Sequence, residues 1–167
     1  MDLLILGGTR FVGRHLVTAA LDRGHRVTLF NRGQSAPDLF PEVETLRGDR
    51  DGNLSALRGR EWDAVVDTCG YVPRIVRASA GLLADAVDRY VFISSISVYE
   101  DSLPPGADES APVAALEDES IEEVTGETYG ALKALCERAA EDAMPGRVVG
   151  VRPGLIVGLH DPTGRFA

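Results

Sequence analysis

The chain has 167 residues, which is the size of a single globular domain. Its hydrophobic fraction of 44% and charged fraction of 26% are ordinary for a folded protein, and no apolar run reaches the ~18–20 residues needed to span a bilayer. The formal net charge of −9 argues against the basic surface that nucleic-acid binding normally requires. We therefore expect neither a membrane nor a nucleic-acid partner.

The N-terminus and the cysteines indicate a cytoplasmic protein. The first residues, MDLLILGGTRF, carry an acidic residue at position 2 and reach glycines at once, unlike a signal or transit peptide. Cys69 and Cys136 lie far apart without metal-ligand spacing, and the three histidines do not cluster. We expect two free thiols and no metal site.

Six short apolar segments alternate with helical patterns or turns. Helices are predicted from Phe11 to Arg23, after Pro73, and from about Thr128 to Ala143. Strands that are rich in Val, Ile and Leu and separated by helices favour a parallel α/β sheet with both faces buried. With a glycine turn after the first strand, the pattern predicts a doubly wound (Rossmann) dinucleotide-binding fold with strand order 3-2-1-4-5-6. The predicted strands are residues 2–6, 26–31, 43–46, 63–68, 89–95 and 147–153.

The predicted elements define the domain organisation. We expect residues 1–158 to form the dinucleotide-binding domain. No closing helix follows the sixth strand, so residues 159–167 are expected to be a tail or the start of a substrate domain that is otherwise missing. Residues 101–127 hold nine acidic residues and no basic one. This acidic segment is either a solvated, mobile loop or a lid on the substrate side.

The glycine turn after the first strand predicts a pyrophosphate site. Gly7 permits a tight turn, and Gly13 allows close packing at the start of the helix. The helix N-terminus then offers free N–H groups and a positive dipole end to phosphate. A merely structural turn is the alternative, since many strand–helix turns contain glycine. The predicted contacts along this turn are Gly7, Thr9, Arg10, Phe11, Val12 and Gly13.

The tip of the second strand favours NADP over NAD, although NAD stays allowed. An NAD site usually places a carboxylate there for the ribose hydroxyls. This chain has Asn31 and Arg32 instead, and Arg32 together with Arg10 could bind a 2′-phosphate. The alternative for Arg32 is a solvated loop residue. Asp49 and Arg50, which follow the third strand, are expected beside the adenine.

Lys133 is the only lysine in the chain, and Tyr129 stands four residues before it. This spacing puts both side chains on one helix face. A tyrosine hydroxyl normally keeps its proton up to about pH 10, and a neighbouring ammonium favours the ionised phenol. A lysine can also donate to ribose hydroxyls, in a pocket where the wider arginine fork would not fit. The alternative is an ordinary exposed helix lysine.

Serines end the fifth predicted strand, at the carboxyl edge of the sheet where ligands bind. A hydroxyl there could bind a substrate oxygen while Tyr129 gives or takes its proton. Serines at such positions also cap helices, which is the structural alternative.

These motifs together resemble the extended short-chain dehydrogenase/reductase superfamily, NAD(P)-dependent epimerase/dehydratase group. The matching stretches are GGTRFVG, GDRD at 48–51, SSISVY at 94–99, YGALK at 129–133 and VRPGLIVG at 151–158. The resemblance implies Tyr129 as the acid–base group, Lys133 as its modulator and ribose ligand, and Ser95 as the substrate hydroxyl partner. It also implies cofactor contacts at Thr68 and Pro153.

The resemblance implies hydride transfer at a secondary alcohol or ketone of a small molecule, plausibly of a nucleotide sugar. It also implies pairing as a homodimer. The GGTRF turn is similar to that of atypical members, some of them reductases and some RNA-associated. The alternative is therefore a non-catalytic NAD(P)-binding regulatory or RNA-associated member.

Overall fold

The computed structural model describes residues 1–100 and 103–163, and these contain one parallel sheet of six strands. The order β3-β2-β1-β4-β5-β6 confirms the predicted doubly wound topology. The predicted boundaries agree with the observed ones to within two residues at every strand end, because the apolar runs mark the buried parts of the strands. The strands are β1 (Asp2–Leu6), β2 (Arg26–Asn31), β3 (Glu44–Arg47), β4 (Trp62–Asp67), β5 (Val87–Ile93) and β6 (Val148–Val151).

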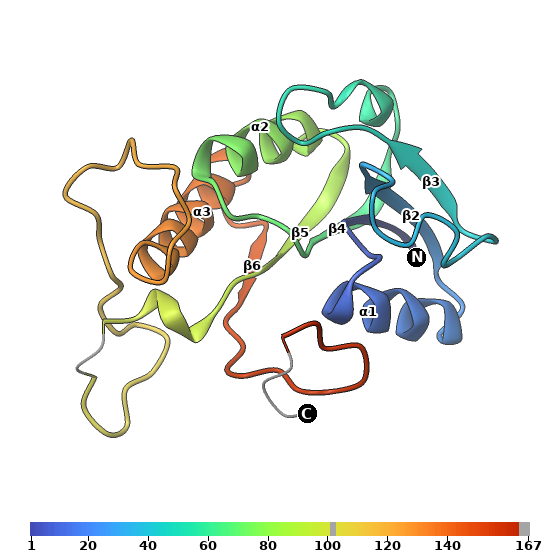
Figure 1. Ribbon diagram of the computed structural model, residues 1–167. Coiled ribbons are helices and arrows are strands. Elements are labelled where there is room, and N and C mark those ends of the chain that lie inside the picture. The colour runs from blue at the N-terminus through green and yellow to red at the C-terminus, as the bar shows by residue number, and fades with distance from the viewer. Residues whose placement is uncertain (101–102, 164–167) are drawn as a thin grey trace.

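Three helices cover the two faces of the sheet. Helix α1 (Phe11–Asp22) lies on one face, and α2 (Pro73–Leu83) and α3 (Tyr129–Ala143) pack side by side on the other (Figure 1). Alternating strand residues supply two cores, one under α1 around Ile5 and Val17 and a larger one under α2 and α3. Two short 3₁₀ turns complete the regular structure, η1 (Ser55–Leu57) and η2 (Ile96–Val98).

The register of the central strands brings separate loops to one edge. Leu6 at the end of β1 pairs with Phe30 of β2 and with Asp67 of β4. The chain leaves β1 and β4 toward opposite faces, which makes their shared edge the switch point where ligands bind in such sheets. The residues that follow these strands therefore meet at one place.

The acidic segment has no helix or strand within its described part, residues 103–127, and it loops out beside α3 (Figure 1). Arg74 of α2 pairs with Glu122 at 2.8 Å, and Arg138 of α3 pairs with Glu119. Because these ion pairs are exposed, each contributes little stability. The predicted mobility or lid role of the segment stays a prediction.

The remaining sequence expectations concern the thiols and the chain end. Cys69 and Cys136 are free, as predicted. Among the described residues, no helix combines the length and apolar character required to cross a bilayer, and no cluster of three metal-ligating side chains occurs. Residues 159–163 of the predicted tail pass the N-terminal end of α1 (Figure 1), where His15 Nε2 lies 2.8 Å from the Leu159 carbonyl oxygen. Residues 164–167 lie outside the described part.

Candidate active site

The turn after β1 is closely packed and requires glycine. Gly7 has φ +101°, and a Cβ there would lie 2.6 Å from Thr68 Oγ1. Gly8, which the sequence interpretation did not single out, has φ +92°. A Cβ on Gly13 would lie 2.9 Å from the Gly8 Cα, so Gly13 allows the first helical turn to close on the loop itself. The backbone therefore has the form of a phosphate cradle.

Two arginines of the predicted phosphate site are uncommitted. Arg10 is the N-cap residue of α1, and its exposed side chain makes no cap hydrogen bond. No acidic residue stands in the first turn of α1, where Phe11 and Val12 begin the helix. Arg32 is also exposed, and neither guanidinium has a hydrogen-bonding partner among the described residues. Both cations are thus available to an anionic ligand.

A cleft of about 460 Å³ opens beside this turn, at the carboxyl edge of β1, β2, β3 and β4. It brings together predicted cofactor residues from three separate loops, and the loop after β4 contributes Cys69 and Tyr71. Their role in binding stays a prediction. The lining residues used below are Gly7, Thr9, Asn31, Arg32, Asp49, Arg50, Asp51, Cys69, Tyr71 and Ile75.

Asn31 organises the loop at one end of the cleft. Its Oδ1 accepts from Arg47 Nη1 at 2.6 Å and from the Gly33 N–H at 2.9 Å, while its Nδ2 donates to the Gly7 carbonyl at 3.3 Å. Arg47, the last residue of β3, was missed by sequence reasoning. Only the pairing of Asn31 with Arg47 in the sheet register reveals the contact.

Arg50 lines the cleft, and its guanidinium is hydrogen-bonded to residues behind the cleft wall. Nη1 and Nη2 donate to the two carboxylate oxygens of Asp67 at 2.7 and 2.8 Å, and Nη2 also donates to Ser79 Oγ at 2.7 Å. The guanidinium is therefore committed to a buried ion pair. Asp49 stays at the cleft, where its Oδ1 accepts from the Asp51 N–H at 3.0 Å.

Lys133 is buried, with only 2% of its surface exposed, so the exposed-lysine alternative is wrong. Its Nζ donates to the Gly70 carbonyl at 2.8 Å and to the Ile93 carbonyl at 2.7 Å, and lies 4.1 Å from the centre of the Phe92 ring. Burial lowers the pKa of Lys133, and the nearby Asp67 carboxylate opposes that shift. An ammonium has three N–H donors, so one is left for a ligand or a neighbouring side chain.

Tyr71 connects the Tyr–Lys pair to the cleft. Tyr129 is the first residue of α3, and its ring centroid lies 6.5 Å from that of Tyr71. The Tyr71 ring is also 5.4 Å from Lys133 Nζ, and Tyr71 lines the cleft that contains Gly7. Burial raises the pKa of the Tyr71 hydroxyl. Sequence reasoning missed Tyr71, although its place four residues after β4 was a usable signal.

The serines after β5 lie in a turn against the start of α3. Ser95 caps η2: its Oγ accepts from the Ser97 N–H at 3.1 Å, which bears out the capping alternative without removing a substrate role. Ser94 Oγ is buried and lacks a partner among the described residues. A Cβ on Gly130 would collide with the Ser97 carbonyl, so α3 packs directly on this turn beside Tyr129.

Pro153 and Thr68 join the serine turn and the glycine turn to neighbouring strands, and their cofactor contacts stay predictions. The Pro153 carbonyl accepts from the Ile96 N–H at 3.0 Å, which joins the chain after β6 to the serine turn. Thr68 Oγ1 donates to the Leu6 carbonyl at 2.8 Å and closes the base of the glycine turn.

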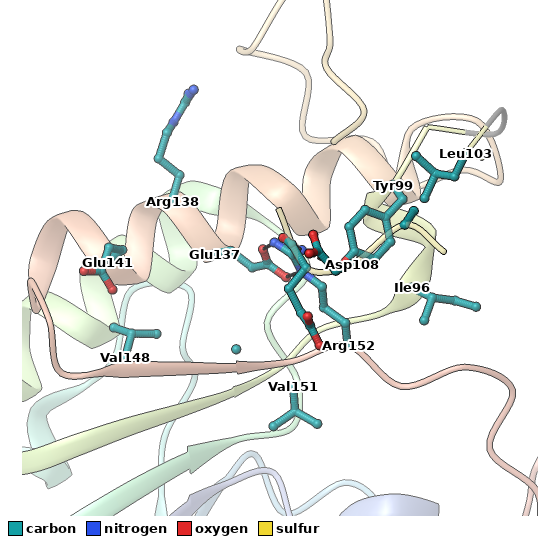
Figure 2. A pocket seen from close by; sticks show the side chains of 13 residues that line it. Ile96, Tyr99, Leu103, Asp108, Glu137, Arg138, Glu141, Val148, Val151 and Arg152 are labelled. Atoms are coloured by element: carbon teal, nitrogen blue, oxygen red, sulfur yellow. Dashed lines mark hydrogen bonds and ion pairs between the residues drawn. The ribbon is translucent and has the colours of Figure 1, made fainter. Parts of the chain in front are cut away.

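A second hollow, of about 790 Å³, lies between β6, α3 and the acidic segment (Figure 2). Arg152, Glu137 and Tyr99 converge at one end of it. Arg152 donates to both carboxylate oxygens of Glu137, at 3.0 and 2.7 Å, and to the Tyr99 hydroxyl at 2.8 Å. This hollow contains none of the predicted catalytic residues, and its central cation is already paired.

The strand order and the glycine turn are those of the doubly wound fold that is typical of dinucleotide-binding domains. Residues 3–72 match the model of the NAD dependent epimerase/dehydratase family.

Curated relatives match the chain over part of their length. The chain is 33% identical over 120 residues to the chloroplast stem-loop binding protein of 41 kDa b of Arabidopsis thaliana, covering 61% of this chain and 32% of the relative. It is 36% identical over 91 residues to a 3 beta-hydroxysteroid dehydrogenase/Delta 5-->4-isomerase of Mycobacterium tuberculosis, covering 53% and 22%. The chain thus spans a third or less of the length of these relatives.

Solved structures share the fold over nearly the whole chain. A UDP-galactose 4-epimerase matches with a TM-score of 0.71 at 21% identity, over 91% of this chain and 55% of that one. Bordetella bronchiseptica WbmG in complex with NAD matches with a TM-score of 0.71 at 18% identity, over 91% and 52%. The chain corresponds to about half of each structure.

Proposed function

We propose that this chain is the cofactor-binding and catalytic part of an NAD(P)-dependent oxidoreductase or epimerase that acts at a secondary alcohol or its ketone. The observation that carries the proposal is the buried Lys133 ammonium, anchored by the Gly70 and Ile93 carbonyls one helical turn from Tyr129. Burying a cation is costly unless it is hydrogen-bonded. Buried ionisable groups with shifted pKa values are concentrated at functional sites.

The cleft fits a dinucleotide. Gly7, Gly8 and Gly13 leave a cradle that a Cβ would fill, and α1 presents its N-terminus to that cradle. Arg10 at the N-terminus of α1 and Arg32 in the lining of the cleft supply two exposed cations, which supports NADP as the preferred cofactor, while the family model that residues 3–72 match is NAD dependent and keeps NAD allowed. Lys133 would bind the nicotinamide ribose with its remaining N–H. The bound cofactor would supply the hydride acceptor or donor.

The chain's own residues handle the proton and the orientation. Tyr129 would take the proton from a substrate hydroxyl, or return it to the carbonyl oxygen in the reverse direction. Ser95 would donate its hydroxyl hydrogen to the same substrate oxygen and so fix its distance from Tyr129.

The substrate is a small molecule with a secondary alcohol. Neighbouring structures are named for UDP-sugar complexes or epimerases, and the mycobacterial relatives are named for hydroxysteroids. We favour a nucleotide sugar. In this proposal residues 1–158 form the dinucleotide-binding domain, and 159–167 lead toward a region that selects the substrate. A homodimer is part of the same proposal.

The Arabidopsis relative is named for stem-loop binding, which keeps RNA as a hypothesis to be tested. The net charge of −9 opposes it, because phosphate contacts need a cationic surface. A salt-dependent filter-binding test with a stem-loop RNA should show no binding at physiological salt.

Fluorescence titration with NADPH and NADH tests the proposal first. We expect saturable binding of both, tighter for NADPH, followed by cofactor reduction or oxidation with a panel of UDP-sugars and hydroxysteroids. A folded protein that binds neither cofactor would refute the proposal.

A further inference from the structure

A buried carboxylate lies between the two halves of the cleft. Asp67, the last residue of β4, is 0% exposed and is surrounded by donors from three directions. Arg50 reaches it from the loop after β3, the Tyr90 hydroxyl reaches it from β5 at 2.7 Å, and the Cys69 N–H donates to Oδ1 at 3.0 Å. No catalytic step described above uses this residue.

The adenosine side of the cleft depends on the Arg50 contact. Arg50 belongs to the short loop 48–53, closed by the Asp49–Asn53 bridge, and that loop lines the cleft. Its guanidinium is bonded bidentately to Asp67 and also to Ser79 of α2. A bidentate arginine–carboxylate pair fixes orientation as well as distance. Asp67 therefore fixes the wall of the cleft on this side.

The nicotinamide side depends on the turn that follows β4. Asp67 accepts from the Cys69 N–H, and the next residue, Gly70, presents its carbonyl to Lys133 Nζ at 2.8 Å. Gly70 packs closely against Phe92 and Asp67, since a Cβ there would lie 2.5 Å from Phe92 Cε2 and 3.0 Å from Asp67 Oδ2. The carbonyl that anchors Lys133 is thus set by the same carboxylate that anchors Arg50.

Stability alone gives a poor reason for such a pair. Arg50 and Asp67 are 9% and 0% exposed in their side chains, and a buried ion pair often does no better than well-packed apolar residues. Arg50 Nε is also left buried without a hydrogen-bond acceptor among the described residues. A fixed geometry is a better reason, because breaking it would disturb both sides of the cleft at once.

We propose that Asp67 is a positioning residue that couples the two halves of the cofactor site, the adenosine half through Arg50 and the nicotinamide half through the Gly70 carbonyl and Lys133. This inference rests on the proposed function, since it assumes that the cleft binds a dinucleotide. It assigns Asp67 no contact with cofactor or substrate.

A double-mutant cycle on NADPH affinity, measured by fluorescence titration, tests the coupling. Lys133→Met should raise the Kd about ten- to a hundredfold, and Asp67→Asn should raise it by at least as much, because Asp67→Asn misplaces both Arg50 and Lys133. Together they should raise the Kd no further than Asp67→Asn alone, because a lysine without its anchor no longer contributes to binding. Independent effects would multiply, and that result would overturn the proposal.

Tyr90→Phe is the matched control. It removes one hydrogen bond from Asp67 on the core side but leaves Arg50 and the 69–70 turn untouched. It should lower the melting temperature, change the NADPH Kd by less than about twofold, and combine multiplicatively with Lys133→Met. A Tyr90→Phe protein that weakens NADPH as much as Asp67→Asn would show that Asp67 only supports the core.

A second variant covers the case in which Asp67→Asn does not fold. Arg50→Gln keeps the Asp67 contacts to Cys69 and Tyr90 and frees only the loop 48–53. It should weaken 2′,5′-ADP and NADPH by the same factor, about tenfold. Unchanged affinity in a folded Arg50→Gln protein would contradict the proposal. If the wild-type protein binds NADPH, multiplicative effects in the double mutant or unchanged affinity of Arg50→Gln would refute the role of Asp67 but not the proposed function.

Discussion

The two ends of the cleft are built in opposite ways. At the end proposed to bind the nicotinamide, Lys133 is 2% exposed and is held by two backbone carbonyls and an aromatic ring. In the part proposed to bind the phosphates, Arg10 and Arg32 are exposed and have no hydrogen-bonding partner among the described residues. Lys133 is therefore fixed before a ligand binds, whereas the side chains of Arg10 and Arg32 would be fixed only by the ligand.

The difference separates two tasks. Proton transfer needs a group fixed to within a fraction of an ångström, which packing and backbone hydrogen bonds provide. Recognition of a phosphate needs a nearby positive charge, which the exposed Arg10 at the α1 N-terminus and the exposed Arg32 after β2 provide. Variants at the buried end should therefore affect turnover, and variants at the exposed end should affect which cofactor binds.

The largest expected effect is at Tyr129. Tyr129→Phe keeps the ring that packs near Tyr71 but removes the hydroxyl, so kcat should fall by about 10³-fold while the NADPH Kd changes little. Steady-state kinetics with the best substrate of the panel, together with a titration, measure both. A Phe variant that retains turnover would remove Tyr129 from the chemistry.

Lys133→Met should reduce both turnover and cofactor affinity, by about ten- to a hundredfold each, because it removes the charge and the ribose donor. Lys133→Arg is the matched variant, because it keeps the positive charge but replaces the compact ammonium with a wider guanidinium. Since the space between the Gly70 and Ile93 carbonyls accepts a compact ammonium, Arg should not rescue. Rescue by Arg would mean that position 133 needs only a positive charge.

At the exposed end, Arg32→Ala should weaken NADPH about tenfold and NADH hardly at all, since only NADPH carries the 2′-phosphate. Titration with both cofactors at two salt concentrations gives the comparison. Arg14→Ala, an exchange at an α1 residue outside the lining of the cleft, serves as the control. Equal losses for NADPH and NADH would contradict the 2′-phosphate assignment.

The smallest expected effect is a pH dependence of stability. Burial lowers the pKa of Lys133 below its ordinary value of 10.5, so between the lowered value and 10.5 the unfolded chain binds more protons than the folded one. The stability of the wild type relative to Lys133→Met should therefore rise as pH increases through that window. Melting temperatures of both proteins at pH 8 and pH 10 test the sign, and a gap that moves the other way would contradict the burial of the charge.

The sequence predicted the fold well, and it singled out Lys133, which the structure shows to be buried. Alternating apolar strands and helices are local patterns, so the strand order and the three helices followed from them. Lys133 and Tyr129 were recognisable because a single lysine stood four residues after a tyrosine on one helix. Their spacing is a local property that folding cannot alter.

Contacts between distant strands could not be predicted in the same way. Arg50 meets Asp67, and Arg47 meets Asn31, only because of the sheet register and the loop path after β3. The sequence therefore predicted Arg50 beside the adenine but did not predict that its guanidinium forms an ion pair with Asp67. The acid at the end of the apolar strand WDAVVD was the one available hint, since a buried carboxylate needs a partner.

A crystal structure of the NADPH complex tests the central claim most directly. The account predicts a nicotinamide ribose hydroxyl within about 3 Å of Lys133 Nζ, with the pyrophosphate at the α1 N-terminus and the Tyr129 hydroxyl facing the nicotinamide. A cofactor whose ribose lies away from Lys133, or a Tyr129 ring turned from the nicotinamide, would contradict it.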